Sequence, residues 1–158
     1  MSAQVQQADT GRHAGTAPPA WHRLATEDLN ALAWLHQTEH APDVLLALYA
    51  NGFPASLSLV NMAHPACRAM DAALQALSGQ GDGSVPANTL DELAADYASI
   101  YLTYGLRAAP YESVWLDDDH LVMQGPTFAV REFYRRHGVQ VPDWRVMTDD
   151  HLTHELQF

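Results

Sequence analysis

The nine histidines are the residues of this chain whose types and spacing best suit chemistry. His36 and His40 are four residues apart and would share one face of a helix, and His151 and His154 are three apart, with Glu155 adjacent. Imidazole and carboxylate groups at such spacings can bind zinc. No third ligand follows either pair at a motif spacing, and solvent-facing or helix-capping histidines explain both pairs equally well. We therefore expect no metal site and no cofactor.

Hydrolytic chemistry requires a nucleophile beside a base and an orienting acid. Ser113 and His151 lie in segments that suit this role, but neither belongs to a Gly-x-Ser-x-Gly turn. Cys67, the single cysteine, falls in an apolar helical pattern and is interpreted as a core residue. The glycine-rich stretch 79–83 lacks the strand and the Lys-Ser/Thr pair of a phosphate-binding loop. We expect that the protein is not an enzyme; a small metal-dependent enzyme using the histidines stays open as an alternative.

The charge of the chain narrows the class of partner. Nineteen acidic residues against eight arginines and no lysine give a net charge of -11. Such a surface repels phosphate backbones and anionic lipid headgroups, so neither nucleic acid nor a membrane surface is expected as a partner. It attracts a basic segment. The longest apolar stretch, Val44–Ala50, is far short of a membrane span, and residues 1–20 do not form a secretory signal. We expect a cytoplasmic protein.

The sequence patterns predict helices for the segments that would position these residues, so the predicted fold class is all-α. Residues 1–20 are expected to be a disordered tail. Thr26, followed by two acids, is expected to cap the first helix. Pro42-Asp43 opens a second helix that stops at Asn51-Gly52. A third is expected over Ser58–Leu77, kinked or split at Pro65.

A polar loop at 80–88 precedes the clearest helical pattern in the chain. Thr89 and Glu92 have the spacing of a capping box, and Gly105 would close this helix. Its apolar residues recur at helical spacing, which by itself favours a core-facing stripe. The stripe comprises Leu90, Leu93, Ala94, Tyr97, Ile100, Tyr101 and Tyr104.

The next segment changes character. Ala109-Pro110-Tyr111 is predicted to be extended, and Tyr111–Leu116 is interpreted as non-helical because it is short and aromatic. Aromatic groups on such backbone often line peptide grooves, and the acids Asp117–Asp119, Asp149 and Asp150 could supply carboxylates nearby.

A further helix should start at Pro126 and end at Gly138. A linker then leads to Thr148-Asp149-Asp150, which is expected to cap a last, short helix whose apolar stripe (Leu152, Leu156, Phe158) has nothing after it to cover it. We expect an N-terminal helical domain over 21–138 and a hinge with the start of a C-terminal helical region over 139–158.

Three segments taken in order carry a recognisable pattern. They are Leu93–Leu102, with Tyr97-x-x-Ile100-Tyr101; Pro110–Leu116, which reads Pro-Tyr-Glu-Ser-Val-Trp-Leu; and Asp150-His151-Leu152 with Glu155-Leu156. Together they resemble the TorD/DmsD/NarJ family of redox enzyme maturation chaperones. The resemblance covers about 90–158 well and the earlier helices in outline. The hinge motif of the family usually reads Glu-x-Pro-Asp-His, whereas Met147–His151 here lacks the glutamate and the proline. The helices that follow in the family after the position of Phe158 are expected to be missing.

The resemblance implies a TorD-like helical bundle and a chaperone without catalytic residues. Such a chaperone binds the twin-arginine signal peptide and the apo form of a molybdopterin oxidoreductase, of the dimethyl sulfoxide or trimethylamine N-oxide reductase type, until its cofactor is inserted. Arginine–carboxylate pairing beside an apolar groove would suit that peptide. A helical interaction module unrelated to export stays open, and a mobile 139–147 linker would allow a helix-exchanged homodimer. The expected peptide-binding residues are Tyr97, Ile100, Tyr101, Pro110, Tyr111, Trp115, Asp150 and His151.

Overall fold

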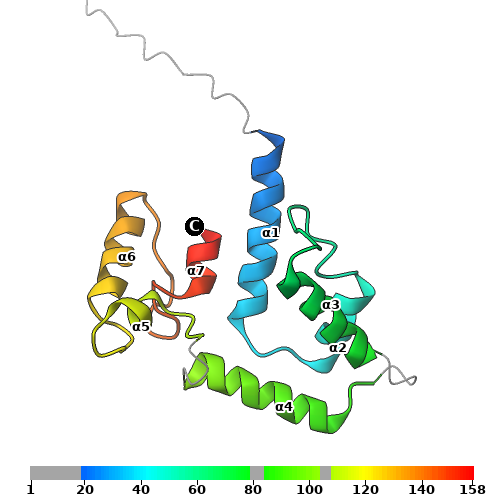
Figure 1. Ribbon diagram of the computed structural model, residues 1–158. Coiled ribbons are helices and arrows are strands. Elements are labelled where there is room, and N and C mark those ends of the chain that lie inside the picture. The colour runs from blue at the N-terminus through cyan, green and yellow to red at the C-terminus, as the bar shows by residue number, and fades with distance from the viewer. Residues whose placement is uncertain (1–18, 79–83, 104–107) are drawn as a thin grey trace, which may run out of the picture.

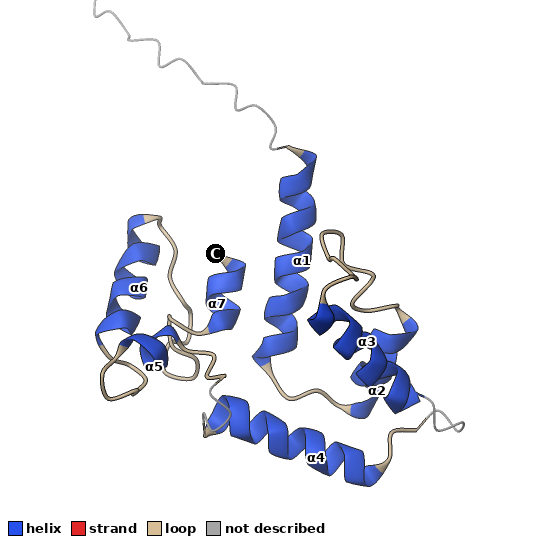
Figure 2. Cartoon of the chain, in the orientation of Figure 1, coloured by secondary structure: helices blue, strands red, loops and turns tan. Residues whose placement is uncertain are grey.

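The computed structural model describes residues 19–78, 84–103 and 108–158 of the chain. Within these ranges every regular element is a helix, which confirms the all-α prediction (Figure 2). None of the described helices is long and apolar enough to cross a bilayer. The elements are α1 (Ala20–Gln37), α2 (Pro42–Ala50), α3 (Pro65–Ser78), α4 (Ala87–Tyr97), the π-helical segment η1 (Ala98–Leu102), α5 (Glu112–Leu116), α6 (Gly125–Arg136) and α7 (Leu152–Gln157).

Helix α1 stands at the centre of the arrangement (Figure 1). The short α7 packs along one side of α1, and the α5/α6 pair lies beyond α7. The α2/α3 pair occupies the other side, and α4 runs across the foot of α1 and α2. The chain therefore brings its last helix back against its first described one.

The start of α1 differs from the sequence expectation. The helix begins at Ala20, after Pro19, so Thr26 lies inside it and its hydroxyl donates to the His22 carbonyl over 2.9 Å. The predicted cap at Thr26 is wrong because the preceding residues, Trp21 to Ala25, continue the helical pattern. Residues 1–18 of the expected tail lie outside the described residues.

Proline positions account for the next two helices. Pro42 sits in the first turn of α2, and Asn51-Gly52 ends the helix with Gly52 at a φ of +70°, as predicted. Pro65 begins α3 instead of kinking a longer helix, since its missing N–H costs nothing in the first turn. The segment before Pro65 forms turns instead of a helix. The backbone N–H groups of Ser58 and Leu59 donate to the Asp28 carboxylate over 2.8 and 2.7 Å, which holds this segment against α1.

Helix α4 starts two residues before the expected capping box. Pro86 is the N-cap residue and no side chain caps the helix, so the predicted Thr89–Glu92 box is wrong. The Thr89 N–H donates to the Pro86 carbonyl over 3.0 Å, which places Thr89 in the first turn. The helix then widens into η1, a feature common near functional sites. Tyr104 and Gly105, its expected end, lie outside the described residues.

The segment after residue 108 is more regular than predicted. Tyr111 is extended, as expected, but Glu112–Leu116 forms the one-turn helix α5. Helix α6 has Pro126 in its first turn and is followed by Gly138 at a φ of +74°, so both predicted ends are confirmed. The predicted cap of the last helix is wrong. His151 caps α7, because its Nδ1 accepts the Thr153 N–H over 3.0 Å.

Helix α7 packs on elements that precede it, but the expected uncovered stripe persists in part, because Phe158 stays 51% exposed. The Thr153 hydroxyl donates to the Ala33 carbonyl of α1 over 3.3 Å. On the other side, the Phe158 ring lies 5.2 Å from that of Phe133 and 4.9 Å from that of Tyr134, centroid to centroid. Helix α7 therefore packs on α1, and Phe158 at its end contacts α6.

The most buried residues of the described chain are largely polar. Ser113, Thr127, Asp150, His151 and Thr153 are all almost completely buried around the start of α7. Large apolar side chains, in contrast, remain on the surface, among them three of the four tryptophans (Trp21, Trp34 and Trp115). Exposed apolar side chains in this number favour a surface that binds partners.

Candidate functional site: a polar junction and an apolar groove

Asp150 is the centre of a buried polar junction between α5 and α7. Its side chain has 0% exposure. One carboxylate oxygen accepts the Ser113 N–H over 2.9 Å, the other accepts the Thr148 hydroxyl over 2.7 Å, and the Asp150 carbonyl accepts the Glu112 N–H over 3.0 Å. Burial alone would raise the pKa of this carboxyl, but these hydrogen bonds outweigh burial and hold it below its usual value. The charge at Asp150 thus fixes the start of α5.

His151 completes the junction from the next position. It pairs with Tyr111 in an isolated antiparallel bridge, and the two rings meet edge to face with centroids 4.8 Å apart. Burial, reinforced by His154 and His36, lowers the pKa of His151 to about 4, although Asp150 opposes the shift. The imidazole is therefore neutral near pH 7, as its role as an acceptor for the Thr153 N–H requires.

His36 connects this junction to η1. The Tyr101 hydroxyl hydrogen-bonds to His36 Nδ1, and the Tyr101 ring stacks on that of Tyr97 with centroids 4.7 Å apart. Burial and the neighbouring His40 lower the pKa of His36. Histidines from α1 and from the start of α7 thus lie close together, and tyrosines of α4 and η1 extend the contact.

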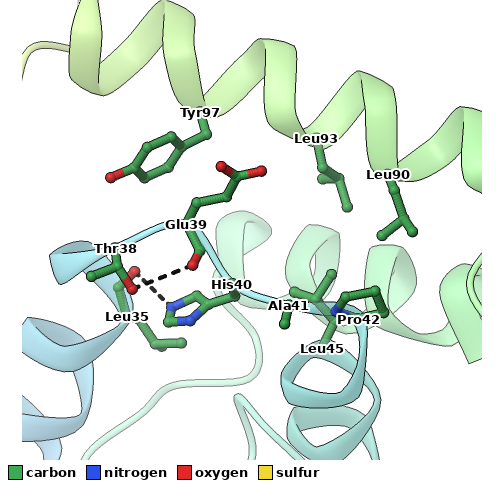
Figure 3. Close-up of a pocket in the computed structure, with 10 residues that line it drawn as sticks. All are labelled: Leu35, Thr38, Glu39, His40, Ala41, Pro42, Leu45, Leu90, Leu93 and Tyr97. Carbon is green, nitrogen blue, oxygen red and sulfur yellow. Dashed lines mark hydrogen bonds between the residues drawn. The ribbon is translucent and has the colours of Figure 1, made fainter.

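An apolar groove opens between α4 and the connection from α1 to α2 (Figure 3). Its volume is about 450 Å³. Leu90, Leu93 and Tyr97 form the α4 wall, and Glu39 is the single carboxylate among the ten lining residues. The other lining residues are Leu35, Thr38, His40, Ala41, Pro42 and Leu45. A groove of this size and composition accepts apolar side chains of a peptide.

The structure separates the predicted site residues into two groups. Tyr97 lines the groove, and the Tyr101 ring stacks on the Tyr97 ring; neither Tyr101 nor Ile100 lines the groove. The other five gather at the polar junction: Pro110, Tyr111, Trp115, Asp150 and His151. Pro110, Asp150 and His151 are buried. Trp115 is 55% exposed, with its indole N–H donating to the Ala109 carbonyl over 2.8 Å.

The chain matches the family model described as the nitrate reductase delta subunit over residues 61–158, which is more than half of its length. It belongs to the nitrate reductase delta subunit family. The expected relation to the TorD/NarJ chaperones is thereby confirmed. Members of this family are redox enzyme maturation chaperones rather than enzymes, and they act on molybdoenzyme subunits. Comparisons with curated proteins and with solved structures gave no match.

The matched part of this delta-subunit family member runs from before α3 to the end of α7. It holds the whole polar junction and the α4 wall of the groove. The opposite wall, from Leu35 to Leu45, precedes the matched residues. The groove therefore joins residues inside the family match to residues that precede it.

Asp149 does not supply a carboxylate to the groove, as the sequence suggested it could. It is buried and pairs with Arg131, whose Nε and terminal nitrogen donate to one carboxylate oxygen over 3.0 and 2.7 Å. The Arg131 guanidinium also lies over the Trp144 ring, 4.4 Å from its centroid. This ion pair secures the residues before α7 to α6.

The histidine pairs do not assemble a metal centre in the described part of the chain, where no three histidine, cysteine or carboxylate side chains are placed to share an ion. His40 Nε2 instead hydrogen-bonds to the Leu35 carbonyl over 3.1 Å, and the His40 ring packs on Trp34. His40 thus helps to shape the α1–α2 connection.

Sequence reasoning missed the Thr38–Pro42 wall of the groove, including Glu39. A short polar break between two predicted helices gives no sign of which distant helix it will face. The position of α4 across the foot of α1 makes this connection one wall of the groove.

Proposed function

We propose that this chaperone binds the twin-arginine signal peptide of a molybdopterin oxidoreductase, of the dimethyl sulfoxide or trimethylamine N-oxide reductase type. It would hold the apo-enzyme in the cytoplasm until the molybdopterin cofactor is inserted. The chaperone itself would bring no cofactor to this task. The client is thus an apolar peptide segment that carries two neighbouring arginines.

The α4 groove is the observation that carries this proposal. Leu90, Leu93 and Tyr97 offer apolar contacts to the hydrophobic run of a signal peptide, and Glu39 offers a carboxylate at the same groove. The net charge of -11 adds long-range attraction for a basic peptide, which speeds encounter more at low salt.

The polar junction has a different part in this proposal. Asp150 and His151 are buried, so a peptide could touch them only after α7 had moved away from α1. We assign them the gating role: they keep α7 wedged in place, and α7 supports α1 next to the groove. Trp115 and Tyr111, at the edge of the junction, would contact the body of the client.

Calorimetric titration of the chain with the signal peptide of a candidate client tests the proposal. We expect micromolar binding that weakens when both arginines are replaced by lysine. Leu93→Ser, at a 38% exposed groove position, should weaken binding, whereas Leu59→Ser, at an exposed position outside the groove, should not. Absence of binding to the wild-type chain would refute the proposal.

The helix-exchanged homodimer also stays a prediction. Helix α7 has only six residues and packs on α1 of its own chain, so exchange would require its release. Light scattering across micromolar concentrations should show a rising mass if exchange occurs. A constant monomer mass would refute it.

A further inference from the structure

We propose that the α4 groove reads only one arginine of the client's pair, and that Glu39 is the residue that reads it. This inference rests on the proposed function and specifies how the groove would recognise its peptide. It makes the two adjacent arginines unequal.

Glu39 is the only lining residue that can pair with a guanidinium. Its side chain rises from the α1–α2 connection toward α4, on the side where Leu93 and Tyr97 line the groove (Figure 3). Among the described residues, no cation lies within ion-pair distance of its carboxylate; the two ion pairs found there are Arg23–Glu27 and Arg131–Asp149. Glu39 is exposed, and no hydrogen bond from the residues that the structure describes occupies its carboxylate oxygens.

No other acid of the described residues lines this groove. Asp28 is occupied by the N–H groups of Ser58 and Leu59, and Asp149 by Arg131. Asp150 is fully buried. Asp43 and Glu92 are exposed but do not line the groove. Asp43 and Glu92 add to the negative potential around the protein, but they would not pair with an arginine bound in the groove.

One carboxylate suits one arginine. A guanidinium presents two parallel N–H groups that occupy both oxygens of a carboxylate, so a second arginine would find no second carboxylate among the lining residues. In an extended peptide, successive side chains also point in opposite directions. When one arginine faces Glu39, its neighbour therefore faces solvent and is attracted only by the net charge. Lysine replaces the solvent-facing arginine well but the paired arginine poorly, because its point charge cannot form the two-bond contact.

Four signal peptides that differ only in the pair (Arg-Arg, Lys-Arg, Arg-Lys and Lys-Lys) test this inference by calorimetry. With the wild-type chain, we expect one single-lysine peptide to lose about tenfold in affinity and the other to stay within about twofold of Arg-Arg. Glu39→Gln should weaken Arg-Arg by about tenfold and abolish the difference between the two single-lysine peptides. Glu92→Gln is the matched control: it makes the same change in charge on an exposed residue outside the groove and should preserve the difference.

Two results would overturn the inference while leaving the proposed function intact. The first is equal weakening by the two single-lysine peptides. The second is an unequal pair whose difference persists in Glu39→Gln. If Arg-Arg does not bind the wild-type chain at all, the proposed function fails and this inference fails with it. Circular dichroism of both variants should match the wild type, since neither side chain is buried.

Discussion

His151→Asn should flatten the acid limb of the pH–stability curve of this chaperone. The buried imidazole of His151 caps α7 as a neutral acceptor for the Thr153 N–H. Protonation would remove that acceptor and place a charge in a nearly closed site. Asparagine also caps helices well and does not titrate, so the variant keeps the cap and removes the proton.

The pKa of His151 sets both the sign and the size of the effect. The pKa falls from 6.5 in the unfolded chain to about 4 in the folded one. As the pH drops below 6.5, the unfolded state therefore takes up the proton first, and stability is lost until the folded state also protonates near pH 4. His151 is only 2% exposed, so solvent screens little of the effect of its protonation on stability. The shift corresponds to a loss of about 3 kcal/mol across that window.

Glu155 acts in the opposite direction over an overlapping range. Burial, Glu112 and Asp150 raise the pKa of its carboxyl from 4.5 to about 7, so its contribution to stability is present below pH 4.5 and lost as the pH rises through 7. Because Glu155 is an exposed residue, solvent screening reduces this contribution. It is also present in both proteins, so it cancels when the variant and the wild type are compared at the same pH.

Urea unfolding followed by circular dichroism, repeated from neutral pH to about pH 4, measures the difference. The smaller side chain of the variant should lower its stability by a constant amount at all pH values. The gap between the two proteins should then narrow by about 3 kcal/mol as the pH falls from 6.5 to 4. If the two curves run parallel, His151 does not titrate as a buried neutral cap and the reasoning is wrong.

Three further substitutions test other parts of the structure, each by urea unfolding at neutral pH. Asp150→Ala leaves the buried Ser113 N–H without an acceptor and should cost at least about 2 kcal/mol; a loss below half of that would contradict the junction. Tyr101→Phe removes the hydroxyl bonded to His36 and should cost about 1 kcal/mol, and unchanged stability would argue against this link. Thr89→Ala should change stability by less than about 0.5 kcal/mol because Thr89 does not cap α4; a loss near 1 kcal/mol would instead favour the capping box.

The sequence alone determined the fold class and the positions of several helix ends. Pro42 and Pro126 mark helix starts, and Gly52 and Gly138 mark helix ends, because these residues act on the backbone of their own turn. The order of the three motifs was also sufficient to predict the family. Such information is local or sequential and needs no knowledge of which elements meet.

Caps were less predictable, since a residue with capping chemistry does not by itself set the position at which a helix starts. Thr89 and the run Thr148-Asp149-Asp150 had the right chemistry at plausible positions, but Pro86 and His151 lie at the N-caps of α4 and α7. Asp149 is drawn instead to Arg131 on α6. Whether a polar residue caps a helix or pairs elsewhere depends on distant side chains such as Arg131, whose positions a local sequence pattern does not give.

Only the tertiary structure decided what the candidate site is. Asp150 and His151 appeared suited to contact a peptide, yet bonds that span 37 residues to Ser113 and 120 residues from Thr153 to Ala33 bury the junction around them. Conversely, Glu39 faces a groove because α4 crosses the foot of α1. Burial, pKa shifts and grooves arise from residues far apart in the chain, so they follow from packing and not from spacing.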